Sequence, residues 1–254
     1  MKKPISDAVI LMAGSGSRLV AGGHVLPKPL IPIGGRAVFS YTIDALRQAG
    51  IRTVHVITGF NSDALLSGIE PLIPAEIKLR PIHNREWQKQ NGISVLAAAP
   101  SVTAPFFLTM GDHLFQPAIV DLLLREAKPN ELNVAIDRKL SSIFDPEDAM
   151  KVQTRGDHIV NIGKDLPHYD AIDIGAFVCP LSFFDYLKEA KSASDRNDCS
   201  LADGVRLMAA AGKVHAIEIG DGWWQDIDTP EMLAAAKKVL GDSGPAPTLG
   251  PALP

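Results

Sequence analysis

The chain has 254 residues, of which 46% are hydrophobic and 21% are charged, and its formal net charge is −4. This profile is typical of a soluble globular protein that buries a full hydrophobic core. The slightly acidic balance argues against a broad basic surface, so neither nucleic acid nor an anionic membrane is expected as a partner.

The N-terminal segment carries no pattern of a signal peptide or of a membrane span. Pro4 and Asp7 interrupt the approach from the basic first residues, and the apolar run that follows is too short for either. The two cysteines, Cys179 and Cys199, lack a CxxC spacing and are expected to be free thiols in a reducing compartment. We therefore expect a cytoplasmic protein.

Strand and helix patterns alternate through the first half of the chain. Strands are expected over residues 7–13, 53–58, 77–82 and 105–110, and helices over 37–49, 61–70, 92–99 and 117–127. This alternation predicts an α/β fold, with a mostly parallel, Rossmann-like sheet and helices on both of its faces. Ligands of such sheets bind at the carboxyl ends of the strands, so the loops that follow the strands are the candidate sites.

The second half of the chain is richer in strand patterns. A hairpin is expected over 149–163, with further strands over 169–180 and 213–220 and helices over 181–190 and 200–211. Thr229 is placed to cap a last helix that runs from Pro230 to about Leu240. Residues 1–240 are therefore predicted to form one domain, and the Gly- and Pro-rich residues 241–254 a disordered tail.

A loop of small residues, Gly14-Ser15-Gly16-Ser17, follows the first predicted strand and leads to Arg18. Backbone N–H groups of a glycine-rich turn at a strand end can bind phosphate oxygens, and Arg18 would add charged donors. A plain strand-to-helix turn is the alternative. The dinucleotide fingerprint needs a third glycine where this chain has Leu19, and a P-loop needs a GK[ST] element that does not follow.

Lys28 lies between Pro27 and Pro29 in the segment "LPKPLIPIGG". Because proline fixes the backbone angle φ, the two prolines hold the origin of the lysine side chain in place. A fixed role in a binding site explains such a lysine better than a solvated surface charge does.

Together, "MAGSGSRL" and "LPKPLIPIGG" resemble the signature of the sugar-phosphate nucleotidyltransferases, which join a nucleoside triphosphate to a sugar 1-phosphate and release pyrophosphate. Met12 and Ser15 stand where alanine and a larger residue are more usual in that family. Four further motifs, "NGISVLAAA", "FFLTMGDHLF", "YDAIDIGAFVC" and "WWQDIDTPEML", are most similar to the cytidylyltransferases that act on inositol 1-phosphate. The resemblance spans residues 7 to about 240. It implies a nucleotidyltransferase fold of the GT-A type, with a small β-rich part that binds the acceptor.

Three aspartates are candidates for holding a divalent metal ion. Asp112 follows the strand predicted over 105–110, where a carboxylate can hold Mg²⁺ over a triphosphate. Asp226 and Asp228 are two residues apart, so their side chains share one face of an extended segment. The resemblance implies that Asp112 and Asp228 hold the Mg²⁺ cofactor, with Asp226 as the second choice in the late motif.

The resemblance also implies which residues contact the nucleotide. It assigns the triphosphate to Ala13, Gly14, Ser15, Gly16 and Ser17, and the base to Gln88, Asn91 and Gly92. Arg18 would hold the departing pyrophosphate, and Lys28 would stabilise charge around the α-phosphate.

For the acceptor, the resemblance points to Lys164 as the residue that guides the attacking phosphate, with Lys151 as a competitor for that role. Asp173 and Gly175 lie where members of the family contact the hydroxyl groups of the acceptor. A carboxylate can accept hydrogen bonds from the hydroxyl groups of a polyol.

The predicted reaction is transfer of CMP from CTP to a phosphorylated polyol, inositol 1-phosphate first of all, by in-line attack on the α-phosphorus. Phosphocholine or another sugar 1-phosphate are alternative acceptors, and the aromatic content of 6% favours a polyol over a quaternary ammonium group. A non-catalytic nucleotide-binding module would be expected to lack Arg18, Lys28 or the aspartates, and Leu19 weighs against a dinucleotide-dependent oxidoreductase. A homodimer is considered as the assembly.

Overall fold

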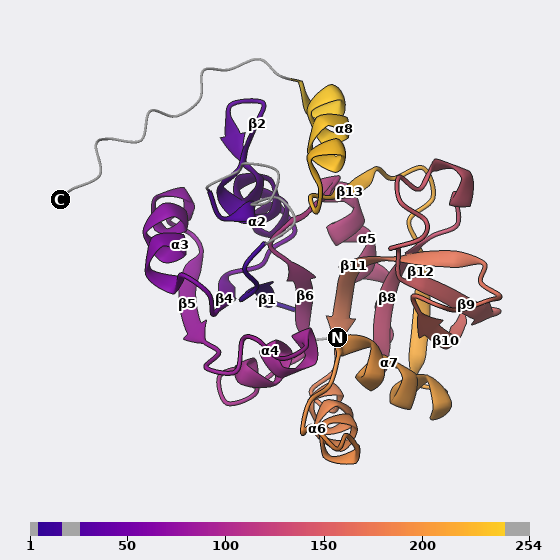
Figure 1. Ribbon diagram of the computed structural model, residues 1–254. Helices are drawn as coiled ribbons and strands as arrows, with labels where there is room; N and C mark the ends of the chain where they lie inside the picture. The colour runs from indigo at the N-terminus through magenta and orange to yellow at the C-terminus, as the bar shows by residue number, and fades with distance from the viewer. Residues whose placement is uncertain (1–4, 17–25, 242–254) are drawn as a thin grey trace.

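The computed structural model describes residues 5–16 and 26–241, and its main feature is a nine-stranded sheet with the strand order β5-β4-β1-β6-β11-β8-β12-β10-β9 (Figure 1). These strands are β1 (Asp7–Met12), β4 (Thr53–Thr58), β5 (Lys78–His83), β6 (Phe106–Met110), β8 (Leu132–Asp137), β9 (Lys151–Arg155), β10 (His158–Gly163), β11 (Ala171–Cys179) and β12 (Val214–Glu218). Two small sheets pair β2 (Pro32–Ile33) with β3 (Arg36–Ala37) and β7 (His113–Phe115) with β13 (Trp224–Asp226).

The parallel part of the large sheet is formed by β5, β4, β1 and β6. These strands come from the alternating strand and helix patterns of the first half of the chain, and helices connect them as crossovers. Because parallel strands end at the same edge, the loops after β1 and β6 lie next to each other. This edge of the sheet carries the glycine-rich loop and Asp112.

The rest of the sheet is mixed, although the sequence predicted mostly parallel pairing. Strand β11 runs antiparallel to both β6 and β8, β9 and β10 form an antiparallel hairpin, and only β8 and β12 pair in parallel. The short turn at Gly156-Asp157 explains the β9–β10 hairpin, because such a turn can join only antiparallel strands. Since β11 runs antiparallel to β6, it begins at the edge where β6 ends. The α/β class is confirmed, and β8 is a buried strand that the sequence patterns missed.

Helices cover both faces of the sheet, as Figure 1 shows. One face packs against α4 (Asn91–Ala98), α6 (Phe183–Ala193) and α7 (Leu201–Ala210), and it includes Val9 and Leu11 of β1. The other face packs against α2 (Val38–Gln48), α3 (Ser62–Ile69) and α5 (Pro117–Glu126), and it includes the alternate residues Ala8 and Ile10. Alternation along a central strand therefore feeds two separate hydrophobic cores.

A third hydrophobic cluster joins the two ends of the described chain. Leu233 and Ala236 of α8 (Pro230–Leu240) pack with Ile31 and Ile33, which flank the short helix η1 (Lys28–Leu30). Figure 1 shows α8 beside the β2–β3 hairpin. The Thr229 hydroxyl accepts a hydrogen bond from the backbone N–H of Met232, so the predicted helix cap is confirmed. This cluster fixes the segment that carries Lys28.

The predicted elements agree with the observed ones to within a few residues at their ends. Both cysteines are buried free thiols, as predicted. Among the described residues, no helix is long and apolar enough to cross a bilayer. The tail predicted over 241–254 lies outside the described residues apart from Gly241.

We predict that His55→Leu weakens the acid sensitivity of folding. His55 is 1% exposed on β4, and neither ring nitrogen has a hydrogen-bond partner among the described residues. Burial lowers the pKa of His55, although the Asp7 carboxylate 3.6 Å away opposes that change. The unfolded chain therefore binds a proton near pH 6.5 that the folded chain refuses, so stability falls as the pH drops below about 6.5.

The measurement is the free energy of unfolding in urea at about pH 7.5 and about pH 5.5, on either side of the ordinary histidine pKa. The wild-type protein loses more stability between these two values than His55→Leu does. Equal losses in the two proteins would contradict the assignment. The remaining loss in the variant is expected to include His215, whose pKa burial also lowers.

Candidate active site

Two cavities meet at the edge of the sheet where β1 and β6 end. The first is lined by Gly14, Ser15 and Gly16 of the loop after β1, together with Lys28. The second has a volume of about 720 Å³ and lies over β11, between α7 and the loops before β9 and after β10. Asp112, which follows β6, lines both cavities. A group transferred from one bound molecule to another would pass this residue.

Lys28 connects two carboxylates that are far apart in the sequence. Its Nζ donates a hydrogen bond of 3.0 Å to Oδ2 of Asp112 and a second one to Oδ1 of Asp228. The Lys28 side chain is only 15% exposed, and burial alone would lower its pKa. The negative charges of Asp112 and Asp228 outweigh burial and raise the pKa of Lys28, so the side chain is a fixed ammonium group.

The other oxygen of Asp112 binds His113. Nδ1 of His113 donates to Oδ1 of Asp112 at 2.8 Å. Burial would raise the pKa of Asp112, but the hydrogen bond from His113 and the charge of Lys28 hold it well below its usual range. Burial opposes the charge on His113, and its bond to Asp112 nevertheless raises its pKa to about 9. At neutral pH Asp112 is therefore a carboxylate held between two cations.

Asp226 and Asp228 reach the site through the pairing of β13 with β7, in which Asp226 lies opposite His113. Both aspartates line the second cavity. Asp228 pairs with Lys28, whereas the Oδ1 of Asp226 accepts a hydrogen bond from the side chain of Gln225. Burial, with the nearby charges of Asp228 and Asp112, raises the pKa of Asp226. Asp228 is thus the member of this pair that converges with Asp112.

The donor set fits Mg²⁺. Asp112 and Asp228 present hard carboxylate oxygens to a shared point, and a cation, the Lys28 ammonium, bridges them in this structure. Within residues 5–16 and 26–241, no group of three or more His, Cys, Asp or Glu side chains is arranged to hold a metal ion. A site with two carboxylates suits Mg²⁺, which keeps several waters and takes its remaining ligands from substrate phosphates.

The glycine-rich loop forms one wall of the first cavity. Gly14, Ser15 and Gly16 line it, as predicted, and Ala13 is buried at the end of β1. Gly16 has a positive φ of 64°, and a Cβ there would lie 3.1 Å from Cγ of Lys28. This close approach explains a glycine at position 16. Ser17 and Arg18 lie outside the described residues, so their predicted roles stay predictions.

Three predicted acceptor residues lie in the second cavity, namely Lys164, Asp173 and Gly175. Oδ1 of Asp173 accepts a hydrogen bond of 2.8 Å from the N–H of Gly175. Burial raises the pKa of Asp173 to about 7, against the opposing effects of that hydrogen bond and of His113. Arg206 of α7 lines the same cavity and was not predicted. Its guanidinium binds the Ile162 carbonyl, a contact that only the folded chain creates.

The two competing lysines have different surroundings. Lys164 lines the second cavity and forms an ion pair with Asp148, which also lines it. Lys151 instead donates to the backbone carbonyls of Glu147 and Lys164, and its Nζ lies 5.7 Å from the ring centre of Tyr169. Lys164 therefore lines the second cavity, whereas Lys151 holds the loop beside it, and the acceptor role predicted for either lysine stays a prediction.

We predict that Lys164→Ala lowers kcat/KM for the phosphorylated acceptor by about 100-fold, because a charge-assisted contact to phosphate is lost. Lys151→Ala is the matched control, and a change of less than about fivefold is expected because its ammonium contacts backbone carbonyls and the Tyr169 ring and does not line the second cavity. Steady-state kinetics with varied acceptor give both numbers. A larger loss in Lys151→Ala than in Lys164→Ala would reverse the assignment.

The residues predicted to frame the base are not gathered around the first cavity. Gln88 is exposed and lines neither cavity, and Asn91 lines the second one. Gly92 is buried, and a Cβ there would lie 2.6 Å from the Cys199 carbonyl oxygen. The missing side chain of Gly92 thus lets α4 pack against the start of α7. Oδ1 of Asn91 accepts a hydrogen bond from the N–H of Leu201, which strengthens the same packing.

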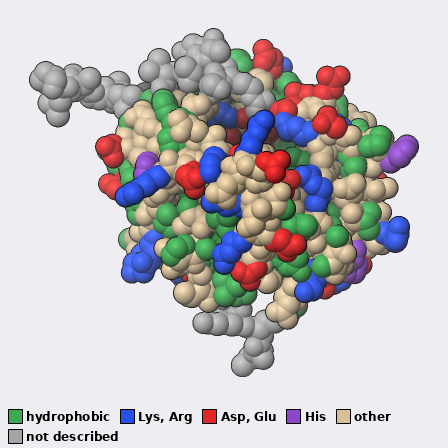
Figure 2. Space-filling view, turned by 60° about the horizontal axis from the view of Figure 1, so that its bottom comes forward, with side chains coloured by type: hydrophobic (Ala, Val, Ile, Leu, Met, Phe, Trp, Pro, Cys, Tyr) green, Lys and Arg blue, Asp and Glu red, His purple; other side chains and the backbone are tan. Residues whose placement is uncertain are grey.

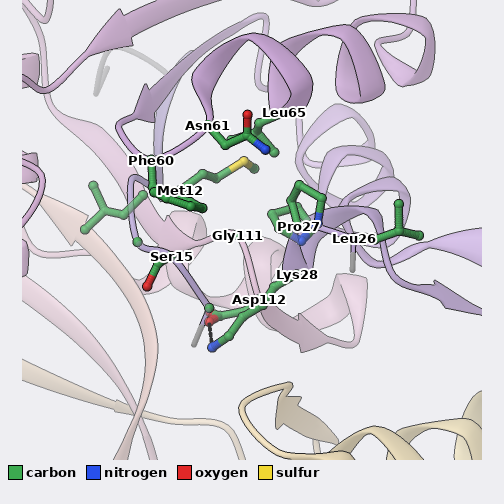
Figure 3. A pocket seen from close by; sticks show the side chains of 14 residues that line it. Met12, Ser15, Leu26, Pro27, Lys28, Phe60, Asn61, Leu65, Gly111 and Asp112 are labelled. Atoms are coloured by element: carbon green, nitrogen blue, oxygen red, sulfur yellow. Dashed lines mark hydrogen bonds and ion pairs between the residues drawn. The ribbon is translucent and has the colours of Figure 1, made fainter. Parts of the chain in front are cut away.

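Sequence reasoning missed the far wall of the first cavity. Phe60, Asn61 and Leu65, from the loop after β4 and from α3, line it opposite Lys28 (Figure 3). Phe60 is 48% exposed and its ring centre lies 5.4 Å from that of Trp87. A large exposed aromatic residue directly after a predicted parallel strand was the available signal. Phe60 and Leu65 give the first cavity an apolar surface beside its charged floor.

We predict that Gly175→Ala disturbs the site through His113. Gly175 has a positive φ of 74°, and a Cβ there would lie 2.5 Å from Cδ2 and Nε2 of His113. The backbone strain costs about 1 kcal/mol of stability, and the displaced ring is expected to lower kcat by about 10- to 100-fold. Gly156→Ala is the control, since its φ is 64° with no atom within 4 Å. Both variants lose stability, but only Gly175→Ala loses turnover. If Gly175→Ala kept the wild-type kcat, the position of the His113 ring would not matter for turnover.

The surface away from the site agrees with the low net charge. Figure 2 shows acidic and basic side chains interspersed on the face turned to the viewer, rather than gathered into a field of one sign. Such a face does not provide the continuous basic track that nucleic acid needs.

Comparison with known sequences gives a family and several relatives. The MobA-like NTP transferase domain matches residues 8–146. A bifunctional IPC transferase and DIPP synthase from Rubrobacter xylanophilus is 31% identical over 248 residues, which cover 94% of this chain and 54% of that protein. A protein of the same name from Thermococcus kodakarensis is 32% identical, over 92% of this chain and 50% of the relative. The chain spans about half the length of the curated relatives it matches.

Solved structures share the fold. The inositol-1-phosphate CTP transferase from T. maritima has a TM-score of 0.77 and 24% sequence identity, covering 94% of this chain and 98% of that one. A putative glucose-1-phosphate thymidylyltransferase from Bacillus anthracis has a TM-score of 0.79 and 19% identity, covering 94% of this chain and 96% of that one.

Proposed function

The chain belongs to the MobA-like NTP transferase domain family, and from this premise we propose that it is a cytidylyltransferase that transfers CMP from CTP to inositol 1-phosphate and releases pyrophosphate. One observation carries the proposal. Asp112 lines both cavities, and Lys28 forms ion pairs there with both Asp112 and Asp228. The names of the relatives support CTP and inositol 1-phosphate as the substrates.

The first cavity is proposed to bind CTP. The N–H groups of Gly14 to Gly16 would face its phosphates, and Arg18 would hold the departing pyrophosphate. Lys28 is close enough to the loop to neutralise charge that develops at the α-phosphate. Phosphoryl transfer of this kind depends on positioning and on charge neutralisation, so the enzyme needs no covalent intermediate.

The second cavity is proposed to bind the acceptor. Lys164 and Arg206 supply positive charge for its phosphate, and Asp173 can accept hydrogen bonds from ring hydroxyls. The volume of about 720 Å³ exceeds the size of one phosphorylated six-membered ring and leaves space for water. The acceptor phosphate is already an anion and attacks without a general base.

Asp112 and Asp228 are the residues that would hold Mg²⁺, and a bound Mg²⁺ would neutralise the phosphate oxygens during the transfer. Asp226 stays beside them as a third carboxylate that lines the same cavity. The cytoplasmic location and the homodimer expected from the sequence remain predictions.

The test is a matrix of pyrophosphate release with Mg²⁺. CTP, UTP, GTP, ATP and dTTP are each combined with inositol 1-phosphate, phosphocholine and several sugar 1-phosphates. We expect the highest kcat/KM for CTP with inositol 1-phosphate. Turnover with another pair and none with this one would overturn the substrate assignment while leaving the nucleotidyltransferase class in place.

One observation favours phosphocholine as a second acceptor class. A side chamber of about 310 Å³ shares Asp148 and Trp224 with the acceptor cavity, and Phe144, Trp223 and Asp145 also line it. Aromatic faces beside carboxylates attract quaternary ammonium groups. Saturation by phosphocholine at lower concentrations than by inositol 1-phosphate would select this alternative in the same matrix.

A further inference from the structure

The bridge formed by Lys28 has a consequence for metal binding. Its ammonium group contacts one oxygen of Asp112 and one oxygen of Asp228, which are the two carboxylates that fit a divalent cation. Figure 3 shows Lys28 and Asp112 pointing toward each other at the floor of the nucleotide cavity. The two carboxylates therefore already share a positive charge.

A divalent cation and this ammonium group compete for the same oxygens. Lys28 is largely buried between the two carboxylates, and a lysine side chain at neutral pH carries an ammonium charge. Two cations only a few ångströms apart repel each other strongly where water screens them poorly. The pair of carboxylates can thus hold either the ammonium or the divalent cation.

His113 does not take part in this competition. It binds Oδ1 of Asp112, whereas Lys28 binds Oδ2. Among the described residues, Lys28 is the basic side chain that forms ion pairs with both Asp112 and Asp228. Removing its charge would leave the bond between His113 and Asp112 in place.

The backbone that carries Lys28 is held in place. Hydrogen bonds from Leu30 to Pro27 and from Ile31 to Lys28 hold η1, and Pro29 is buried. The stem of Lys28 passes within 3.1 Å of where a Cβ of Gly16 would be. Phosphate oxygens bound by the loop at Gly14 to Gly16 would therefore offer the ammonium a second anionic partner nearby.

We propose that Lys28 is an internal counterion that keeps a divalent cation off Asp112 and Asp228 until a nucleoside triphosphate draws its ammonium group away. The metal ion then enters with the nucleotide and not before it. This inference rests on the proposed function for the identity of the nucleotide, but it concerns binding and needs no turnover.

The test is a titration with Mn²⁺ followed by electron paramagnetic resonance and water proton relaxation, without acceptor. Wild-type protein is expected to bind Mn²⁺ at this site only after CTP is added. Lys28→Met is expected to bind Mn²⁺ without nucleotide at least about tenfold more tightly than wild type, because the ammonium group that bridges the two carboxylates is removed. Adding Asp228→Asn to Lys28→Met removes the gain, and Lys28→Arg, which keeps the charge, behaves as wild type.

Lys139→Met is the matched control. Lys139 also pairs with a buried carboxylate, Asp137, at 2.9 Å, but that carboxylate is single and accepts a hydrogen bond from Nε1 of Trp224. No gain in Mn²⁺ binding is expected there. Circular dichroism and melting temperatures identify a variant that fails to fold, and in that case the wild-type titration with and without CTP decides.

Two results would overturn the inference: Mn²⁺ binding by wild type without nucleotide as tight as by Lys28→Met, or no gain in folded Lys28→Met. Neither result bears on the reaction, since pyrophosphate release is measured separately. Conversely, a gain in Lys28→Met with no turnover for any substrate pair would reject the proposed function and support the counterion.

Discussion

Asp112→Asn is expected to lower kcat for pyrophosphate release by about 10³-fold, the cost of removing one preorganised charged group from a phosphoryl-transfer site. Asp112 is the residue common to both cavities, and its two oxygens bind Lys28 and His113. An amide is nearly isosteric with the carboxylate, so it keeps the packing. However, the amide carries no negative charge that could hold a metal ion. Its NH₂ group is also a hydrogen-bond donor at a position where the carboxylate oxygen accepted a hydrogen bond.

The measurement is steady-state pyrophosphate release at saturating CTP and acceptor. Asp121→Asn, on the exposed side of α5, serves as the control for loss of one negative charge and should retain wild-type kcat. Melting temperatures separate a folding defect from a catalytic one. An Asp112→Asn variant that keeps more than about a tenth of wild-type kcat would remove Asp112 from the transfer step.

Lys28→Ala is expected to lower kcat by about 10²- to 10³-fold, because the ammonium group neutralises charge at the α-phosphate. It is also expected to lower stability by about 1–2 kcal/mol, since Asp112 and Asp228 lose their common partner in a partly screened environment. Lys28→Arg restores charge but not the shape of the ammonium group, so partial activity is expected.

Both quantities are measured on the same preparations, by pyrophosphate release and by urea unfolding. Lys238→Ala, at an exposed position on α8, controls for the loss of one positive charge. A variant that is less stable but turns over normally would show that Lys28 has a structural role only.

The sequence alone predicted those features of the fold and of the site that depend on a short local pattern of residues. The prolines around Lys28 and the strand before Asp112 predicted where each residue stands in the fold, and the alternation of elements predicted the parallel half of the sheet. The sequence could not predict the hydrogen bond between Lys28 and Asp228, because 200 residues separate the two. Only tertiary packing brings them together.

The remaining differences have the same cause. Gly92 lets α4 pack against the start of α7, because its neighbours are Cys199 and Ser200, which are distant in sequence. Lys151 donates to a loop carbonyl, that of Lys164 on the far side of the β9–β10 hairpin. The antiparallel pairing of β11 with β6 was not predicted, and it places Asp173 at the edge where β6 ends. Arg206 belongs to no motif, so only the second cavity identifies it, whereas the position of Phe60 after a predicted strand was a signal that no motif included.

The late position of Asp228 also bears on how the protein is made. Lys28 and Asp112 leave the ribosome early, but Asp228 and the helix α8 that packs beside Lys28 are synthesised last among the described elements. Domains begin to fold during synthesis, so a partly made chain can assemble the parallel strands while its ion bridge is still incomplete. The proposed site is therefore complete only after Asp228 and the helix α8 have been synthesised.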